Sequence, residues 1–209
     1  DIIMEENKYL KLARQARSED NTEDAKAFYD KVRTEDPTNG EAKYFYMYYA
    51  LYDGKNKEIP NRFGNLCKGL KSAIELIIES ALSKDEKLKG IEEIVDSFVP
   101  EVWSINKYMN GKNTSQIKVF DFYEIKSCAV AGMSALKALG DQIDKAYIGD
   151  MEAKRLAVIA WKEYVSLSQK WYSWAIKGDA EIYAEKIKKF DSSYEMPKKA
   201  GCISCANKK

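Results

Sequence analysis

The chain has 209 residues, of which 45% are hydrophobic and 32% are charged, with only 4 prolines and 11 glycines. This composition is typical of a soluble all-helical protein, and it excludes a disordered chain, a collagen-like repeat and a turn-rich β-sandwich. The absence of histidine excludes imidazole-based catalysis and histidine-containing metal sites, and a net charge of +1 argues against nucleic acid as a partner.

Two helices are expected at the N-terminus. Apolar and small residues at helical spacing predict a helix over 7–17, and the polar run at 21–24 supplies an N-cap for a second helix that includes 25–32. Pro37 ends this pair because it disfavours a helical residue before it. A third helix over 41–51 is so rich in tyrosine that aromatic rings must point to all of its sides.

The middle of the chain contains the most regular amphipathic pattern, over 63–81. A helix with this pattern must bury one face, so truncating Leu70 or Ile74 should destabilise the fold. Ser83 and Glu86 have the spacing of a capping box, which predicts the start of another helix there.

Three further helical segments are predicted in the second half of the chain. The first covers about 116–147, and Gly140 could bend or divide it; the second ends near 176, and the third ends near 190. Trp161 continues an apolar stripe and is expected in the core. Trp171 and Trp174, near the end of a helix, are expected to be partly exposed.

No apolar run approaches the roughly 18 residues that a membrane-spanning helix needs, so no membrane span is expected. Residues 1–6 lack the basic start and apolar core of a signal peptide. Four cysteines are too few for a disulfide framework in a chain of this length. These features favour a cytoplasmic protein, and the start at Asp1 in place of Met leaves room for upstream residues.

The first helix pair resembles a tetratricopeptide repeat, with small residues where the two helices touch. The matching residues are Tyr9, Leu12, Ala13, Ala16, Ala25, Tyr29 and Pro37. A shift by one repeat, about 34 residues, finds Ile59, Phe63 and Lys71 in place of the repeat's alanine, aromatic residue and proline. The pattern is therefore one repeat followed by the first helix of a degenerate second. The chain is similar to uncharacterised bacterial proteins in which a zinc ribbon precedes a tetratricopeptide-like domain.

We therefore predict an all-α fold, an antiparallel helical array. Its tetratricopeptide-like segment, residues 1–54, should continue into a bundle of longer helices over 55–190, and the two should form one continuous domain. Residues 191–209 should form a mobile basic tail.

The resemblance implies a concave groove that is lined by the first helix of each pair. Its lining would be Asn7, Leu10, Arg14, Arg17, Tyr44, Tyr48 and Leu51. Two arginines beside tyrosine rings suit a peptide that carries a carboxylate. Exposed charges contribute little to stability, so replacing both arginines by alanine should leave folding almost unchanged. The alternative for the tyrosine-rich helix is a position between two neighbouring helices.

Cys202 and Cys205 have the spacing of one half of a zinc ribbon. Tetrahedral zinc needs four ligands, and Cys67 and Cys128 lie in apparent core stripes of distant helices. No cofactor is therefore expected unless further zinc ligands come from residues absent from this sequence or from another chain. The alternative for this segment is an inert tail.

The leading hypothesis for function is a non-enzymatic helical interaction module that binds a peptide or protein partner. The alternative is a small-ligand-binding or enzymatic helix bundle, with a pocket among the tyrosine and tryptophan side chains of the longer helices. A third possibility is a regulatory zinc protein. The sequence leaves the ligand and the oligomeric state open.

Overall fold

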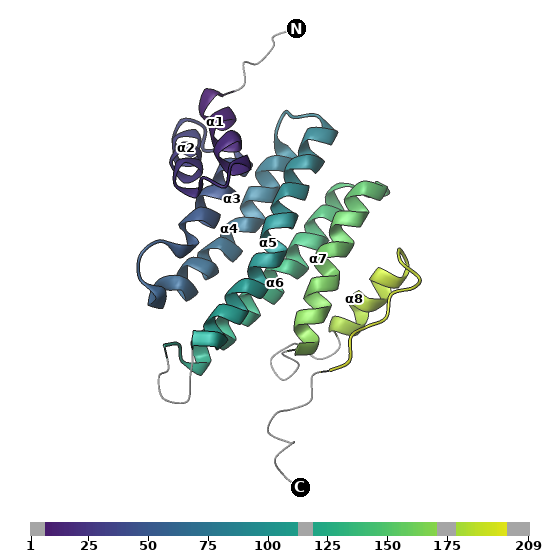
Figure 1. Cartoon of the computed structure of the whole chain (residues 1–209). Coiled ribbons are helices and arrows are strands. Elements are labelled where there is room, and N and C mark those ends of the chain that lie inside the picture. The colour runs from purple at the N-terminus through teal and green to yellow at the C-terminus, as the bar shows by residue number, and fades with distance from the viewer. Residues whose placement is uncertain (1–6, 113–118, 171–178, 200–209) are drawn as a thin grey trace. The chain divides into compact units, whose positions relative to one another are not determined.

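The computed structural model describes residues 7–112, 119–170 and 179–199. Helices, and no strand, form the regular structure of these ranges, which confirms the all-α fold. The α-helices are α1 (Lys8–Ser18), α2 (Thr22–Glu35), α3 (Gly40–Tyr49), α4 (Ile59–Glu79), α5 (Lys84–Lys112), α6 (Phe122–Ala146), α7 (Met151–Lys170) and α8 (Asp179–Lys188) (Figure 1).

The chain divides into two compact units, Asp1–Ile94 and Val95–Lys209. The division falls inside α5, whose first part belongs to the first unit. The expected junction between 1–54 and 55–190 lies within the first unit, where α3 packs along α4. A Cβ atom on Gly40, the first residue of α3, would lie 2.3 Å from the carbonyl oxygen of Ala73 in α4. Glycine therefore permits the close approach of these two helices.

The first unit starts with the expected helical hairpin. α1 packs on α2, α2 on α3 and α3 on α4. Asparagine side chains cap the N-termini of the first three helices, which fixes where each begins; the caps are Asn7, Asn21 and Asn39. The hairpin closes over residues that are fully buried, namely Ala13, Ala25, Tyr29 and Val32.

The amphipathic pattern of α4 faces the core as predicted. Its buried residues are Ile59, Phe63, Leu66, Leu70, Ala73, Ile74 and Ile77. The predicted capping box at the start of α5 is also present. The backbone N–H of Glu86 donates to Ser83 Oγ (3.3 Å), and that of Ser83 donates to Glu86 Oε2 (2.9 Å).

The second unit contains the remainder of α5 together with α6, α7 and α8. α6 continues through Gly140 as one helix, so this glycine does not divide it. A Cβ atom on Gly140 would lie 2.4 Å from Trp161 Nε1 and 2.9 Å from the carbonyl oxygen of Ala157. The glycine thus allows α7 to pack closely, and Trp161 is buried as predicted.

The chain after α8 contacts α7. Lys162 Nζ donates to Asp191 Oδ2 (2.8 Å) and lies 5.5 Å from the centre of the Tyr194 ring. The first residues of the expected tail therefore pack on the second unit. Trp171, Trp174, Cys202 and Cys205 lie outside the described residues.

No helix in the described ranges combines the length and the apolar character that a membrane span requires.

Candidate functional site

Part of the predicted groove lining is buried in the structure. Tyr44 and Leu51 are fully buried, and Leu10 is 9% exposed, so Tyr44 and Leu51 do not line an open groove. The physical reason is the position of α3 between α2 and α4, which matches the alternative given for this helix. The Tyr44 ring meets Phe45 edge-on and stacks against the half-buried Tyr48 at 5.9 Å between ring centres.

Asn7 has a local structural role. Its Oδ1 accepts hydrogen bonds from the backbone N–H groups of Tyr9 (2.9 Å) and Leu10 (3.3 Å), and its Nδ2 donates to Glu35 Oε2 (3.2 Å). It therefore fixes the start of α1 and links α1 to the end of α2.

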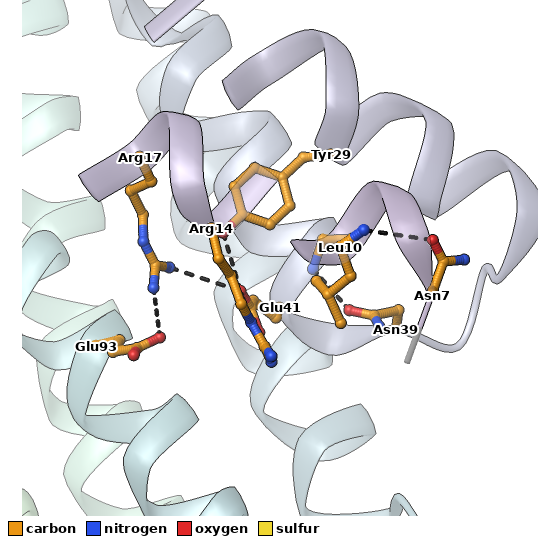
Figure 2. A network of polar contacts seen from close by, with 9 residues as sticks. Asn7, Leu10, Arg14, Arg17, Tyr29, Asn39, Glu41 and Glu93 are labelled. Atoms are coloured by element: carbon orange, nitrogen blue, oxygen red, sulfur yellow. Dashed lines mark hydrogen bonds and ion pairs between the residues drawn. The ribbon is translucent and has the colours of Figure 1, made fainter. Parts of the chain in front are cut away.

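Arg14 and Arg17 both point toward one carboxylate, that of Glu41 at the start of α3 (Figure 2). Arg14 Nε lies 3.1 Å from each carboxylate oxygen of Glu41, and Arg14 Nη2 donates to Oε2 at 2.7 Å. Arg17 Nη1 lies 3.7 Å from Glu41 Oε1. The two arginines thus meet a carboxylate of their own chain where a ligand carboxylate was expected.

Glu41 is 7% exposed, and its carboxylate also accepts a hydrogen bond from the Tyr29 hydroxyl at 2.9 Å. Burial and the negative charge of Glu41 raise the pKa of Tyr29, so this phenol remains a neutral donor. The carboxylate therefore receives contacts from α1 and α2 while it belongs to α3. Such a buried charge is tolerated because its partners surround it.

Arg17 extends the network to the first part of α5. Its Nη2 donates to Glu93 Oε2 at 2.7 Å, and its guanidinium carbon lies 4.2 Å from the centre of the Phe45 ring. Burial alone would lower the pKa of Arg17, but the neighbouring carboxylates of Glu93 and Glu41 oppose it, and the pKa is raised. Arg17 is therefore a charged link between α1, α3 and α5. We call Arg14, Arg17, Tyr29, Glu41 and Glu93 the Glu41 cluster.

The Glu41 cluster changes the expected role of the arginines. Side-chain exposure is 43% for Arg14 and 21% for Arg17. Replacing both by alanine would leave the Glu41 carboxylate buried without its ionic partners, which costs free energy. These contacts argue against the expectation that the double replacement leaves folding almost unchanged.

A second feature of α1 is its charge. The helix contains Lys8, Lys11, Arg14 and Arg17 and no acidic residue. Lys8 and Lys11 are exposed, and neither forms an ion pair with any residue that the structure describes. Together with the half-exposed Arg14, they follow one another at three-residue spacing. We call Lys8, Lys11 and Arg14 the α1 basic face.

Within the described ranges, no group of three or more histidine, cysteine, aspartate or glutamate side chains could hold a metal ion. Cys67 is half-buried. Cys128 is buried, and burial together with the nearby Glu124 raises the pKa of its thiol to about 12. A thiol with this pKa is a poor nucleophile and a poor metal ligand near neutral pH.

Comparison of the chain with protein-family models, with curated proteins and with solved structures finds no match in any of the three. The resemblance to a tetratricopeptide repeat therefore remains a prediction from the spacing of residues in the first helix pair.

We expect the first unit to lose stability above about pH 10, the ordinary pKa of tyrosine. Burial raises the pKa of Tyr49 to about 12 and also raises that of Tyr29. Between the unfolded and folded pKa values the unfolded chain has released protons that the folded chain keeps, so the free energy of unfolding falls as pH rises. Measuring that free energy at about pH 8 and about pH 11 checks the direction.

The Tyr29→Phe variant shows whether this buried tyrosine contributes. The variant lacks the hydroxyl that titrates. Its free energy of unfolding should therefore fall less than that of the parent between about pH 8 and about pH 11. The difference should be up to about 1.4 kcal/mol for each pH unit above about pH 10. Tyr52→Phe is the control, because Tyr52 is 50% exposed. Equal losses in the parent and Tyr29→Phe would contradict the prediction.

Proposed function

We propose that the chain is a non-enzymatic interaction module, and that it binds an acidic segment of a peptide or protein partner at the α1 basic face. The observation that carries this proposal is the unbalanced charge of α1. Of its four cations, Arg14 and Arg17 pair with Glu41 and Glu93, whereas Lys8 and Lys11 face solvent with no ion pair among the described residues.

The Glu41 cluster supports such a surface in two ways. It fixes α1 against α2, α3 and the first part of α5, so the lysines are presented on a helix that is held in place. It also holds the Arg14 guanidinium in one orientation at the surface, and a group that is already ordered loses less entropy when it binds.

The expected partner chemistry follows from the charge. Adjacent cations create a positive potential that speeds the encounter with acidic segments and discriminates against basic ones. The interaction should weaken as the salt concentration rises, because exposed charges are screened over a Debye length of about 8 Å at physiological ionic strength.

The test uses the full chain and an array of synthetic peptides that range from acidic to basic. We expect the parent to select acidic peptides, and the double variant Lys8→Ala/Lys11→Ala to bind the best of them about tenfold more weakly, from two exposed pairs of about 0.7 kcal/mol each. The free energy of unfolding should change by less than about 0.5 kcal/mol.

Lys55→Ala/Lys57→Ala is the matched control. These two lysines are also exposed, lie in the same unit, and form no ion pair within the described ranges. Equal weakening by both double variants would show that only the net charge matters. Binding that ignores peptide charge, or that survives the loss of Lys8 and Lys11 undiminished, would refute the proposed surface.

A further inference from the structure

Two amide side chains are buried in the second unit with hydrogen-bonding atoms that lack partners. Gln169 in α7 is 2% exposed, and neither its Nε2 nor its Oε1 makes a hydrogen bond to a residue that the structure describes. Asn106 in α5 is 1% exposed. Its Nδ2 donates to the carbonyl oxygen of Val102 (2.7 Å), whereas its Oδ1 accepts no hydrogen bond from the described residues.

Such atoms are rare in folded proteins. About nine in ten buried polar groups have a partner in the protein or in ordered water, because an unmatched buried amide loses its hydration without compensation. The surroundings make the loss severe, since fully buried apolar residues flank both amides along their helices; these are Val102, Ile105, Met109 and Val165. The two amides therefore lack the partners that their burial requires.

Helix geometry puts the two amides at about the same height along α5 and α7. Trp103 Nε1 donates to Glu163 Oε2 (2.8 Å), and Lys170 Nζ lies 5.1 Å from the centre of a Trp103 ring. Trp103 is therefore level with the middle of the segment 163–170 of α7. Figure 1 shows α5 and α7 running in the same direction, and both helices rise by about 1.5 Å per residue. Asn106, one turn beyond Trp103, comes level with Gln169.

We propose that Asn106 and Gln169 bind a small, uncharged molecule inside the second unit, one that has both hydrogen-bond donors and acceptors. The free atoms of the pair are one amide nitrogen and two amide oxygens, so they offer donors and acceptors and no formal charge. A charged ligand would need a counter-charge at this depth. Ordered water and a small alcohol or amide share the required chemistry. This site is independent of the α1 basic face.

A double-mutant cycle tests whether one occupant joins the two amides. The variants are Asn106→Leu, Gln169→Met and the double replacement. All four tryptophans lie beyond residue 94, so their fluorescence reports on the second unit. If one molecule bridges the amides, each single variant lowers the melting temperature by about 4 °C, and the double variant loses no more than the worse single variant.

The opposite result overturns the proposal. If the amides bind nothing, an apolar replacement removes an unmatched polar group, so each single variant raises the melting temperature and the two increments add. Lys107→Leu is the control, because Lys107 lies next to Asn106 on the same helix and is exposed. It should change the melting temperature by less than about 1 °C.

A crystal structure of the parent protein identifies the occupant. Density within hydrogen-bond distance of both Gln169 and Asn106 supports the proposal, and a direct amide–amide hydrogen bond with no density between the residues overturns it. Native mass spectrometry distinguishes a bound organic molecule from ordered water. A mass added to the parent and lost in the double variant indicates an organic ligand, which would favour a small-ligand-binding bundle, whereas density without added mass indicates water.

Discussion

Replacing Glu41 by leucine is expected to destabilise the first unit by about 3 kcal/mol. The variant leaves the Tyr29 hydroxyl buried without its acceptor and removes a carboxylate that contacts Arg14 and Arg17. The loss should lie at the lower end of the range for a broken buried ion pair, because Arg14 is half exposed and Arg17 keeps Glu93. Chemical denaturation followed by far-UV circular dichroism measures it, and tryptophan fluorescence records the second unit separately.

Glu35→Ala is the matched control for this experiment. Glu35 is an exposed carboxylate on α2 that accepts a hydrogen bond from Asn7, so its loss should cost less than about 1 kcal/mol. If Glu41→Leu cost no more than Glu35→Ala, the Glu41 cluster would contribute nothing to the stability of the first unit, and its arginines would again be candidates for ligand contacts.

Replacing Ile74 by alanine should cost about 2 to 5 kcal/mol, the range for a buried residue truncated in a packed core. Ile74 is fully buried in the middle of α4, and Leu70, one turn earlier, is 2% exposed. The loss combines the transfer free energy of the deleted atoms with the cost of the cavity they leave. The same denaturation experiment measures it.

Glu75→Ala is the neighbouring control on α4. Its carboxylate is exposed and lies 3.7 Å from Lys71 Nζ, so the expected change is less than about 0.5 kcal/mol. A loss below about 1 kcal/mol for Ile74→Ala would mean that this face of α4 is poorly packed, which would contradict the arrangement of the first unit.

The helices could be predicted because their signals are local. The apolar stripe of α4 and the capping box of Ser83 and Glu86 each involve residues within a few turns, and both are confirmed. The structural role of Gly140 could not be predicted from such a local signal. Glycine within a helix can bend it or can admit a neighbouring helix, and only the partner, Trp161, decides between the two.

The Glu41 cluster could not be predicted because its members lie far apart in the sequence. Arg14 and Glu41 are separated by 27 positions. A glutamate in the first turn of a helix is ordinary, since it favours the positive end of the helix dipole, so Glu41 gave no signal of a buried ion pair. The resemblance to a repeat placed both arginines on an open groove and contained no information about their internal partner.

The two buried amides were also hidden in the sequence. Asn106 and Gln169 are polar residues among helical apolar residues, and composition alone assigns such residues to a solvated face. Both are buried in the folded second unit, where the Trp103–Glu163 hydrogen bond links α5 to α7 across 60 positions. The absence of acidic residues in α1, in contrast, was visible in the sequence and is the signal that could have pointed to the α1 basic face.

The most direct test of the proposed function is an NMR titration of the isotopically labelled chain with the acidic peptide that binds best. We predict that the backbone amide shifts change mainly over 8–18, in α1, and that Lys8→Ala/Lys11→Ala removes these changes. Shifts concentrated at Phe122 and Tyr123, which are 57% and 77% exposed at the start of α6, would place the partner on an apolar surface of the second unit and contradict the account.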